Sequence, residues 1–210
     1  MNILSIDTSG LSFSLTISDG RTYCEYIGES GISSSEKVLI EIDKLTKNID
    51  ISPKDIGCII FNNGPGSFTG VRVSSAVAQA IGFSNNCPVY GINSLSLIAY
   101  NTFKESKERQ IQVVKNAFGT QVFHGLFTIN NKKIISDSIV STMSYSDVEI
   151  NDDYILVSDR DEIANSNASC FPIKNIMGAN LQIEYFEIYV DKKKNFDYKD
   201  ALPSYAGHVI

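Results

Sequence analysis

The amino-acid sequence predicts an α/β protein, and three features of its first hundred residues carry that prediction. The chain opens with three short segments of strand character that are separated by turn residues. A segment with helical spacing, an uninterrupted apolar run and a second helical segment then follow in that order. A strand meander followed by alternating helices and strands is typical of α/β domains, in which helices flank the sheet.

The first three segments predict an antiparallel meander. Residues 3–7 form an apolar run that ends in Asp7, which is typical of a buried strand. Residues 11–17 alternate apolar and hydroxyl side chains, so one face of this second strand is expected to be buried. Asp19-Gly20 is a strong hairpin signal, and residues 22–26 follow as the third strand.

Two helices and an intervening strand are predicted next. Residues 38–49 place apolar side chains at helical spacing, and one of the serines at 33–35 is expected to be the N-cap. Residues 58–61 read as a buried strand of the parallel type. Residues 70–82 predict a helix made largely of small residues, which would let a neighbouring element approach closely.

The rest of the chain predicts a second, smaller lobe. A strand at 89–92 and a helix from Ser94 complete the first lobe, and a charged stretch at 104–110 marks the boundary. We therefore expect lobes at 1–105 and 106–210. In the second lobe we expect a hairpin, a buried strand and a helix, followed by an extended C-terminus; these lie at residues 111–127, 154–157, 177–189 and 201–206.

Composition narrows the functional classes. Among the 210 residues, 43% are hydrophobic and 20% are charged, which indicates a globular protein. The net charge of −6 argues against strong direct binding of nucleic acid, which needs a basic face. Four cysteines without metal-ligand spacing and two distant histidines, His124 and His208, predict no metal site. We expect a cytoplasmic protein, because neither a signal peptide nor a membrane-spanning run is present.

One motif has the form of a phosphate loop. The segment at 64–72 reads GPGSFTGVR and leads from an apolar strand into a helix, where backbone N–H groups and the helix dipole can attract an anion. It is neither a Walker A motif nor a dinucleotide fingerprint. A tight strand-to-helix turn is the favoured interpretation. The candidate residues of a degenerate phosphate loop are Asp7, Thr8, Ser9, Gly64, Gly66, Ser67 and Thr69.

The two motifs together resemble a known family. The IDTS sequence at 6–9 with its meander resembles the first phosphate loop of the actin, sugar-kinase and Hsp70 ATPase superfamily. The segment GPGSFTGVR resembles the signature of the bacterial TsaB (YeaZ) family, and residues 202–205 resemble the terminal Pro-x-Tyr segment of that family. The resemblance implies a two-lobe actin-like ATPase (ribonuclease H-like) fold with mixed sheets flanked by helices and a reduced second lobe.

The sequence departs from the family pattern at two places. Residues 116–118 read Asn-Ala-Phe where the family often has Asp-Ala-Arg, and Ser34 stands where the family commonly has a histidine. The substitution at Asn116 removes an acid from the second lobe, where a nucleotide site would need one. We therefore expect Asp7 to cap its own loop by hydrogen bonding rather than to act in catalysis.

The resemblance also implies a function. Family members act as non-catalytic accessory subunits that bind and activate the TsaD transferase, which forms N6-threonylcarbamoyladenosine in tRNAs reading ANN codons. A TsaE-type ATPase would be a further partner, the chain could form a homodimer, and tRNA would be met only through the complex. We expect no membrane partner, no catalytic or metal-binding residue, and no cofactor beyond weak or absent ATP or ADP binding, with ATP-Mg used by the wider complex.

Two expectations concern an alternative function and the partner-binding surface. The alternative function is a small-molecule kinase or ATPase of the actin-like superfamily that uses Asp7 and the glycine loop. The partner-binding surface is expected on the two helices of the first lobe. The candidate interface residues are Val38, Leu39, Ile42, Gly70, Val71, Ser74, Ser75 and Ala78.

Overall fold

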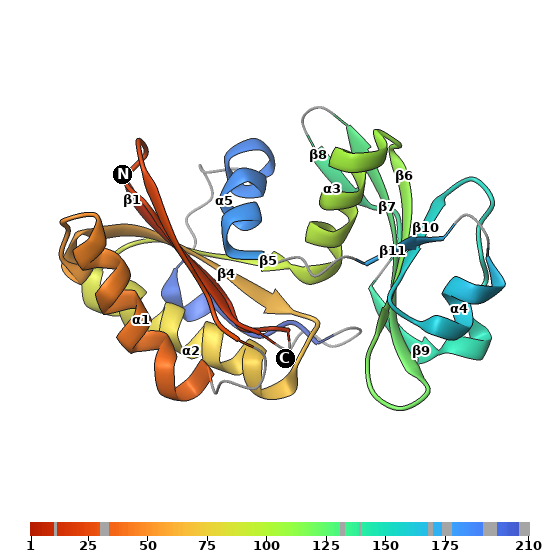
Figure 1. Cartoon of the computed structure of the whole chain (residues 1–210), viewed down its shortest axis with the longest axis horizontal. Helices are drawn as coiled ribbons and strands as arrows, with labels where there is room; N and C mark the ends of the chain where they lie inside the picture. Colours follow the sequence, from red (N-terminus) through yellow and green to blue (C-terminus); the bar gives the residue numbers. More distant parts are fainter. Residues whose placement is uncertain are drawn as a thin grey trace. The chain divides into compact units, whose positions relative to one another are not determined.

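The structure is a computed structural model, and it describes residues 1–10, 12–29, 34–130, 133–138, 140–167, 170–173, 178–190 and 197–205. The chain forms two compact units (Figure 1). The first unit comprises Met1–Ser94 with Met177–Ser204, and the second comprises Leu95–Ile176 with Tyr205–Ile210. This division differs from the predicted lobes, because a helix late in the sequence packs on the first sheet and residues 95–105 belong to the second unit.

The first unit is built on a five-stranded sheet with the order β3-β2-β1-β4-β5. Its strands are β1 (Asn2–Asp7), β2 (Ser14–Ser18), β3 (Tyr23–Ile27), β4 (Ile56–Gly64) and β5 (Val89–Asn93). The first three strands pair antiparallel, which confirms the predicted meander. Strands β4 and β5 continue the sheet in parallel with β1. The sheet is therefore mixed, as an α/β class predicts.

Three helices cover this sheet. Figure 1 shows α1 (Ser34–Asn48) and α2 (Phe68–Asn85) on one face and α5 (Gly178–Tyr189) on the other. The start of α1 at Ser34 places Ser34 and Ser35 inside the helix, and Ser33 lies outside the described residues. Ser67 is the N-cap of α2, where its hydroxyl accepts a hydrogen bond from the Gly70 N–H at 3.3 Å.

The two faces of the first sheet differ in chemistry because side chains alternate along each strand. The face toward α1 and α2 is apolar and forms a buried cluster with the inner sides of both helices. Its sheet members are Leu4, Ile6, Leu15, Ile17, Ile59 and Phe61. The opposite face, under α5, is mixed: Ile3, Ile60 and Tyr90 are buried there beside polar side chains. Its buried polar residues are Ser5, Asp7, Ser14, Thr16 and Asn62.

The second unit contains a sheet with the order β11-β10-β6-β7-β8, in which β9 also pairs with β7. Its elements are α3 (Ser94–Ser106), β6 (Gln110–Asn116), β7 (Gln121–Asn130), β8 (Lys133–Ser136), β9 (Ser141–Ser144), β10 (Ile155–Ser158), α4 (Asp161–Ser166) and β11 (Phe171–Pro172). The predicted hairpin and the strand near 154–157 are confirmed. The short elements β8, β9, β11 and α4 were not predicted, because none is long enough to show a periodic pattern.

Three short 3₁₀ helices complete the described secondary structure, at Pro53–Asp55, Tyr145–Asp147 and Tyr198–Asp200. The predicted helix near 177–189 is present as α5. Residues 201–204, which were predicted to be extended, have no regular secondary structure, and Ala201 lies in a turn with φ −75° and ψ 61°. Tyr205 forms an isolated bridge, and residue 206 lies outside the described residues. Within the described ranges, no helix combines the length and the apolar character that crossing a membrane requires.

Candidate functional site

Asp7 stands at the end of β1, on the face of the first sheet that α5 covers, where the sequence predicted a candidate site residue. Its side chain is buried, with 8% of the residue exposed. Atom Oδ1 accepts hydrogen bonds from the Ser9 N–H at 2.9 Å and the Ser9 hydroxyl at 2.7 Å. Atom Oδ2 accepts one from the Asn62 amide Nδ2 at 3.0 Å. Both carboxylate oxygens are therefore engaged by donors of the same chain.

Asn62, at the end of β4, holds this arrangement in one orientation. Its Oδ1 accepts hydrogen bonds from the Gly64 N–H at 2.9 Å and the Ser94 hydroxyl at 2.7 Å. The Ser74 hydroxyl, which comes from α2, donates to the Asn62 carbonyl at 2.8 Å. Because Oδ1 is committed to two donors, the amide can offer only Nδ2 to Asp7. Asn62 was not among the predicted site residues, although it follows an apolar strand as Asp7 does.

The glycine loop packs directly on the loop after Asp7. The Ser67 N–H donates to the Ser9 carbonyl at 2.8 Å, and the Thr8 hydroxyl donates to the Gly70 carbonyl at 2.6 Å. A β-carbon at Gly66 would lie 2.6 Å from the Ser9 carbonyl oxygen, and one at Gly70 would overlap the Thr8 carbonyl. These two glycines therefore permit close backbone contact between the loops, which supports the tight-turn interpretation of the motif.

Six of the seven candidate phosphate-loop residues are brought together in this way. Asp7, Thr8 and Ser9 form one strand-end loop, and Gly64, Gly66 and Ser67 belong to the facing loop. Thr69 lies on the exposed side of the first turn of α2. A phosphate at these loops would need free backbone N–H groups. Those of Ser9 and Ser67 already donate hydrogen bonds within the chain, to Asp7 and to the Ser9 carbonyl.

Helix α5 covers the Asp7 carboxylate. A β-carbon at Gly178, the first residue of the helix, would overlap Oδ2 of Asp7. The next residue, Ala179, donates its N–H to the Ser14 hydroxyl at 3.1 Å, and Gln182 donates from Nε2 to the Ile6 carbonyl at 3.3 Å. The positive end of the α5 dipole thus lies against the Asp7 carboxylate. No sequence pattern of the α5 segment predicted this contact.

The C-terminal segment of the first unit covers one side of α2. The Ser204 N–H donates to the Asn63 carbonyl at 2.6 Å, beside the glycine loop. The Ala201 carbonyl accepts hydrogen bonds from the Ser75 hydroxyl and from Gln79 Nε2, the latter at 3.1 Å. The segment that resembles the family's terminal motif is therefore part of the fold of the first unit, as far as Ser204.

The predicted interface residues need correction, because seven of the eight lie inside the first unit. Val38, Ile42, Gly70, Val71, Ser74, Ser75 and Ala78 are all buried. Leu39 is the exception, with 61% exposed. The small residues of α2 serve contacts within the chain: Gly70 meets Thr8, and the Ser74 and Ser75 hydroxyls bond backbone carbonyls. Helical spacing alone could not tell the inner stripe from the outer one.

The outer stripe of α2 consists of different residues. Its exposed members are Phe68, Thr69, Arg72, Ala76, Ala80 and Phe83. The Arg72 guanidinium lies over the Phe68 ring at 3.3 Å from the ring centroid. Phe68 is 68% exposed and Phe83 is 67% exposed. This stripe therefore combines two aromatic side chains with small residues that would let a partner approach the helix closely.

Leu39 extends this surface onto α1. On the opposite side of α1, Asn48 Nδ2 lies 3.7 Å from Cys24 Sγ of strand β3. Residues nine positions apart on an α-helix point in opposite directions, so Leu39 points away from β3 and toward the side where α2 lies. We refer to Leu39 together with the exposed α2 stripe as the α1/α2 outer face.

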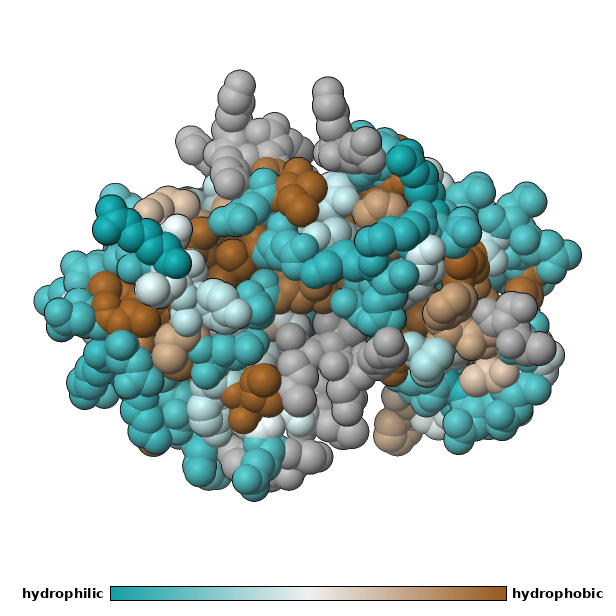
Figure 2. Space-filling view, turned by 45° about the horizontal axis from the view of Figure 1, so that its top comes forward, coloured by the Kyte–Doolittle hydropathy of each residue, from teal (hydrophilic) through white to brown (hydrophobic). Residues whose placement is uncertain are grey.

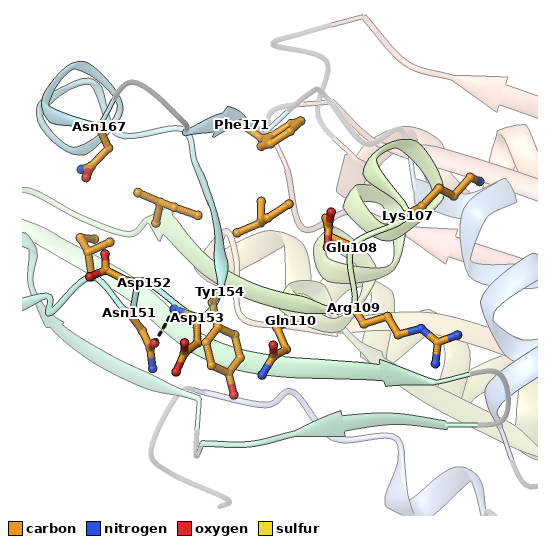
Figure 3. A pocket seen from close by; sticks show the side chains of 13 residues that line it. Lys107, Glu108, Arg109, Gln110, Asn151, Asp152, Asp153, Tyr154, Asn167 and Phe171 are labelled. Atoms are coloured by element: carbon orange, nitrogen blue, oxygen red, sulfur yellow. Dashed lines mark hydrogen bonds between the residues drawn. The ribbon is translucent and has the colours of Figure 1, made fainter.

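The second unit contains a pocket of about 850 Å³. Figure 3 shows Asp152, Asp153 and Tyr154 grouped on one side, whereas Lys107 and Arg109 point away from them. Charged groups that diverge in this way do not form a site for one small ligand. Within the described part of the chain, no group of three or more His, Cys, Asp or Glu side chains is arranged to hold a metal ion.

In the second unit, the His124 ring is hydrogen-bonded to the buried side chain of Gln112. Gln112 is fully buried, and its Oε1 accepts from the Asn151 N–H at 2.9 Å while Nε2 donates to the Glu149 carbonyl at 2.7 Å. The same Nε2 lies 3.0 Å from His124 Nε2, which must therefore accept the hydrogen bond and belong to a neutral ring. Burial lowers the pKa of His124, consistent with this neutral form. His208 lies outside the described residues.

Asn116 stands where a nucleotide site of the second lobe would need an acid, and its polar groups bond within the chain. The Asn116 N–H donates to Asp159 Oδ1 at 2.6 Å, and the Asn116 side chain donates to the Asp159 carbonyl at 3.1 Å. Asn116 is exposed at the end of β6 and connects this strand to the loop before α4. Its role in the structure is to hold a turn.

Comparison with known proteins gives consistent similarities. The family model described as TsaD: tRNA N6-adenosine threonylcarbamoyltransferase matches residues 30–175. A tRNA threonylcarbamoyladenosine biosynthesis protein TsaB from Buchnera aphidicola subsp. Schizaphis graminum is 30% identical over 185 residues, covering 85% of this chain and 88% of that protein. The protein of the same name from Bacillus subtilis is 29% identical over 132 residues, covering 62% of this chain and 57% of that protein.

A solved structure shows the same fold. YeaZ from Pseudomonas aeruginosa superimposes with a TM-score of 0.80 at 18% identity, covering 97% of this chain and 99% of that one. At this level of identity the similarity concerns the fold, which is the α/β fold of the actin-like and ribonuclease H-like type. The predicted fold class is therefore confirmed.

Proposed function

Because the chain belongs to the TsaB (YeaZ) family, we propose that it is an accessory subunit in the synthesis of N6-threonylcarbamoyladenosine in tRNA. It would bind and activate a TsaD-type threonylcarbamoyl transferase rather than perform the transfer itself. The names of the related proteins place them in this biosynthesis, and the matching family model describes the transferase. A TsaE-type ATPase would be a further partner, and tRNA, including tRNAs that read ANN codons, would be met through the complex.

One observation carries the non-catalytic part of the proposal. The carboxylate of Asp7 accepts three hydrogen bonds from Ser9 and Asn62, and the first residue of α5 lies against it. A kinase or ATPase of this fold would need a carboxylate open to a metal-bound nucleotide. Here that position is filled by protein, which argues against the alternative of a small-molecule kinase and against tight binding of ATP or ADP.

The α1/α2 outer face is the proposed docking surface for the transferase. It offers exposed apolar side chains at Leu39, Phe68 and Phe83, which can provide buried anchors in an interface. Ala76 and Ala80 lie between the two phenylalanines along the helix and are small enough for a partner helix to pack closely. The same face could serve a homodimer of the free chain, because small residues that admit a partner helix also admit a second copy of α2.

The docking proposal is tested with charges placed on the exposed stripe. The double variant Ala76→Glu, Ala80→Glu keeps good helix formers at both positions, so the free protein should fold as the parent does. We expect at least a tenfold weaker affinity for the purified cognate TsaD-type transferase, measured by isothermal titration calorimetry. The matched control is Ile188→Glu, which adds a charge to an exposed position of α5, on the opposite face of the sheet.

Two outcomes of the binding experiment would contradict the proposal, and a separate measurement addresses the homodimer. Equal affinities of the double variant and the parent would remove the α1/α2 outer face from the interface. Failure of the parent to bind the transferase would refute the accessory function itself. Sedimentation velocity of the free chain, with and without the two substitutions, reports whether the same face forms a homodimer.

The enzymatic alternative has its own test. Calorimetric titration of the parent with Mg-ATP should show no tight binding, because the Asp7 loop and the glycine loop bond to each other. Micromolar binding that disappears in Asp7→Ala would instead establish a nucleotide site and favour a kinase or ATPase.

A further inference from the structure

A fully buried glutamine, Gln112 of β6, lies beside two pockets of the second unit. On the face of the molecule drawn in Figure 2, apolar residues occur as separate patches among hydrophilic ones, which is common on protein surfaces. Beneath the surface, Gln112 borders a pocket of about 590 Å³. A buried side-chain amide is costly unless its hydrogen bonds are satisfied, so its partners indicate its role.

Gln112 holds the segment between the 3₁₀ helix at Tyr145–Asp147 and β10 against the sheet. Its Oε1 accepts from the Asn151 N–H at 2.9 Å, and its Nε2 donates to the Glu149 carbonyl at 2.7 Å. Because a backbone N–H can only donate and a carbonyl can only accept, these two contacts fix which end of the amide carries the oxygen.

The held segment is a wall that two pockets share. Residues 150–153 line both the pocket of about 590 Å³ and the pocket of about 850 Å³. Figure 3 shows Asn151, Asp152 and Asp153 grouped on one side of the larger pocket. A movement of this segment away from the sheet would therefore change both pockets at once.

The third partner of Gln112 is His124, from the neighbouring strand β7. Nε2 of Gln112 lies 3.0 Å from Nε2 of His124. Since the end of the amide that faces the ring is the donor, the ring must accept, which places the imidazole proton on Nδ1. A protonated ring carries a hydrogen on both nitrogens, so protonation would set two donors against each other at this position.

A turn of the Gln112 amide by half a revolution removes that conflict. Oε1 would then accept from the imidazolium Nε2–H in a charge-assisted hydrogen bond, which is stronger than a bond between neutral groups. The same turn breaks the contacts to Glu149 and Asn151. Glu149 is exposed and Asn151 is half-buried, so water can take over their backbone groups. The amide thus has two arrangements, one for each charge state of the ring.

Other titratable groups near His124 come mainly from the held segment. The acidic side chains that line the same pocket are Asp147, Glu149, Asp152 and Asp153. The strands on either side of β7 place Val114 and Ser141 opposite His124. Asp137, after β8, bonds to Thr128 and Tyr154 farther along the sheet. Carboxylates favour the charged ring and burial opposes it; burial prevails and lowers the pKa of His124.

We propose that His124 and Gln112 form a pH-sensitive gate between these two pockets. With a neutral ring, Gln112 holds residues 149–151 on the sheet and the gate is closed. When the ring takes up a proton at Nε2, Gln112 turns toward it, the segment is released and the two pockets join. The gate uses no residue of the α1/α2 outer face, so it is independent of the proposed docking surface.

Proton linkage gives the direction of the response. In the closed state, burial holds the pKa of the His124 ring below the ordinary value of 6.5, whereas in the open state the ring is solvated or paired and its pKa lies at or above that value. The closed state therefore binds fewer protons, and a falling pH favours opening. Uptake of one proton changes the opening constant by at most about tenfold per pH unit between the two pKa values.

The test is NMR spectroscopy of the full, ¹⁵N-labelled chain from about pH 7.5 to about 5.5, a range that spans the ordinary pKa of histidine. The sequence has two histidines, so His208→Gln identifies the ring signals of His124. At the upper pH the ring nitrogens should show the Nδ1–H tautomer. As His124 titrates, the hydrogen-exchange protection factor of the Asn151 amide should fall by up to about tenfold per pH unit.

An internal reference and two variants sharpen the test. The Ile129 N–H, which donates to the Arg109 carbonyl at 2.8 Å, should keep its protection factor over the same range. In His124→Gln, an amide oxygen can accept from Gln112 without taking up a proton, so protection of Asn151 should not depend on pH. In Gln112→Glu, a carboxylate faces the ring, so the pKa of His124 should rise above 6.5. His208→Gln is the matched control and should respond as the parent does.

The measurements on the parent alone can overturn the proposal. An Nε2–H tautomer of His124 at the upper pH would do so, as would an Asn151 amide that stays protected while His124 titrates. The parent's response persisting in His124→Gln would assign it to other groups and refute the gate. Equal losses of protection at Asn151 and Ile129 would show unfolding of the unit instead of local opening. These experiments involve no partner, so their outcome is separate from that of the accessory function.

Discussion

Replacing Asp7 by alanine should destabilise the free protein, and the sign of this change distinguishes a structural carboxylate from a functional one. In the structure Asp7 accepts from Ser9 N–H, the Ser9 hydroxyl and Asn62 Nδ2, at 2.9, 2.7 and 3.0 Å. Asp7→Ala removes all three acceptor contacts. Asn62 cannot turn its oxygen toward the gap, because Oδ1 already accepts from Gly64 and Ser94.

The size of the effect follows from these contacts. Leaving a buried donor without an acceptor costs about 1–3 kcal/mol, and the Ser9 hydroxyl can find a new partner by rotation. With two donors left unpaired, we expect a loss of about 3 kcal/mol in the free energy of unfolding. For a chain of this length that corresponds to roughly 6–12 °C in the melting temperature. Asp7→Asn keeps the volume but turns one amide NH₂ toward another, so about half the effect is expected.

The assay is urea denaturation followed by circular dichroism, without any ligand. A loss of about 3 kcal/mol lowers the midpoint by roughly 1–1.5 M urea for a slope of about 2–3 kcal/mol/M. Active-site carboxylates are often held at a cost to stability, so removing one frequently stabilises the protein. An unchanged or raised midpoint in Asp7→Ala would therefore refute the structural interpretation and reopen the nucleotide site.

Two further predictions concern stability. Gly70→Ala should lower the free energy of unfolding by about 2–4 kcal/mol, because the added β-carbon would overlap the Thr8 carbonyl. The matched control is Gly20→Ala, where nothing lies within 4 Å and φ is 90°, so that strain alone should cost about 1 kcal/mol. Equal urea midpoints of the two variants would contradict this prediction. Burial holds the pKa of His124 below its unfolded value of about 6.5, so stability should fall as the pH drops from 7.5 through 6.5 to 5.5. The same pH series on His124→Gln should show a smaller decline; an identical decline would assign the effect to other groups.

The arrangement of the first unit was largely predictable from the sequence. The apolar run before Asp7, the Asp19-Gly20 turn and the apolar run at 58–61 each leave a local signature, and each matches an element of the structure. The boundary between units was not predictable from the charged stretch at 104–110. Helix α5 follows the second unit in sequence but packs on the first sheet, and a contact over that distance leaves no local pattern.

The sequence predicted which residues form the candidate site, but it did not predict which contacts their side chains make. The sequence identified Asp7 and the glycine loop, and the structure brings them together. It could not show that Asn62 and Gly178 complete the arrangement, because neither has a motif of its own. Seven of the eight predicted interface residues are buried within the first unit for a related reason. A helix built of small residues, such as α2, has a weak contrast between its inner and outer stripes.

The way the first sheet is covered limits where a partner of the first unit can bind. One face packs against α1 and α2 and the other against α5, so neither face is open to a partner over the described residues. The ends of β1 and β4 are filled by the Asp7 loop, the glycine loop and the segment up to Ser204. Among the described residues, what remains is the outer side of each helix and the two edge strands, β3 and β5, each of which is only five residues long.

Among these surfaces, packing chemistry favours the α1/α2 outer face. Small residues at Ala76 and Ala80 reduce the distance at which a partner helix can pack, and the exposed rings of Phe68 and Phe83 provide apolar area at both ends of the stripe. Edge strand β3 offers backbone donors and acceptors but little apolar area beyond Tyr23 and Ile27. We therefore propose that a partner of the first unit binds the outer sides of α1 and α2, because the loops and α5 already occupy the end of the sheet around Asp7.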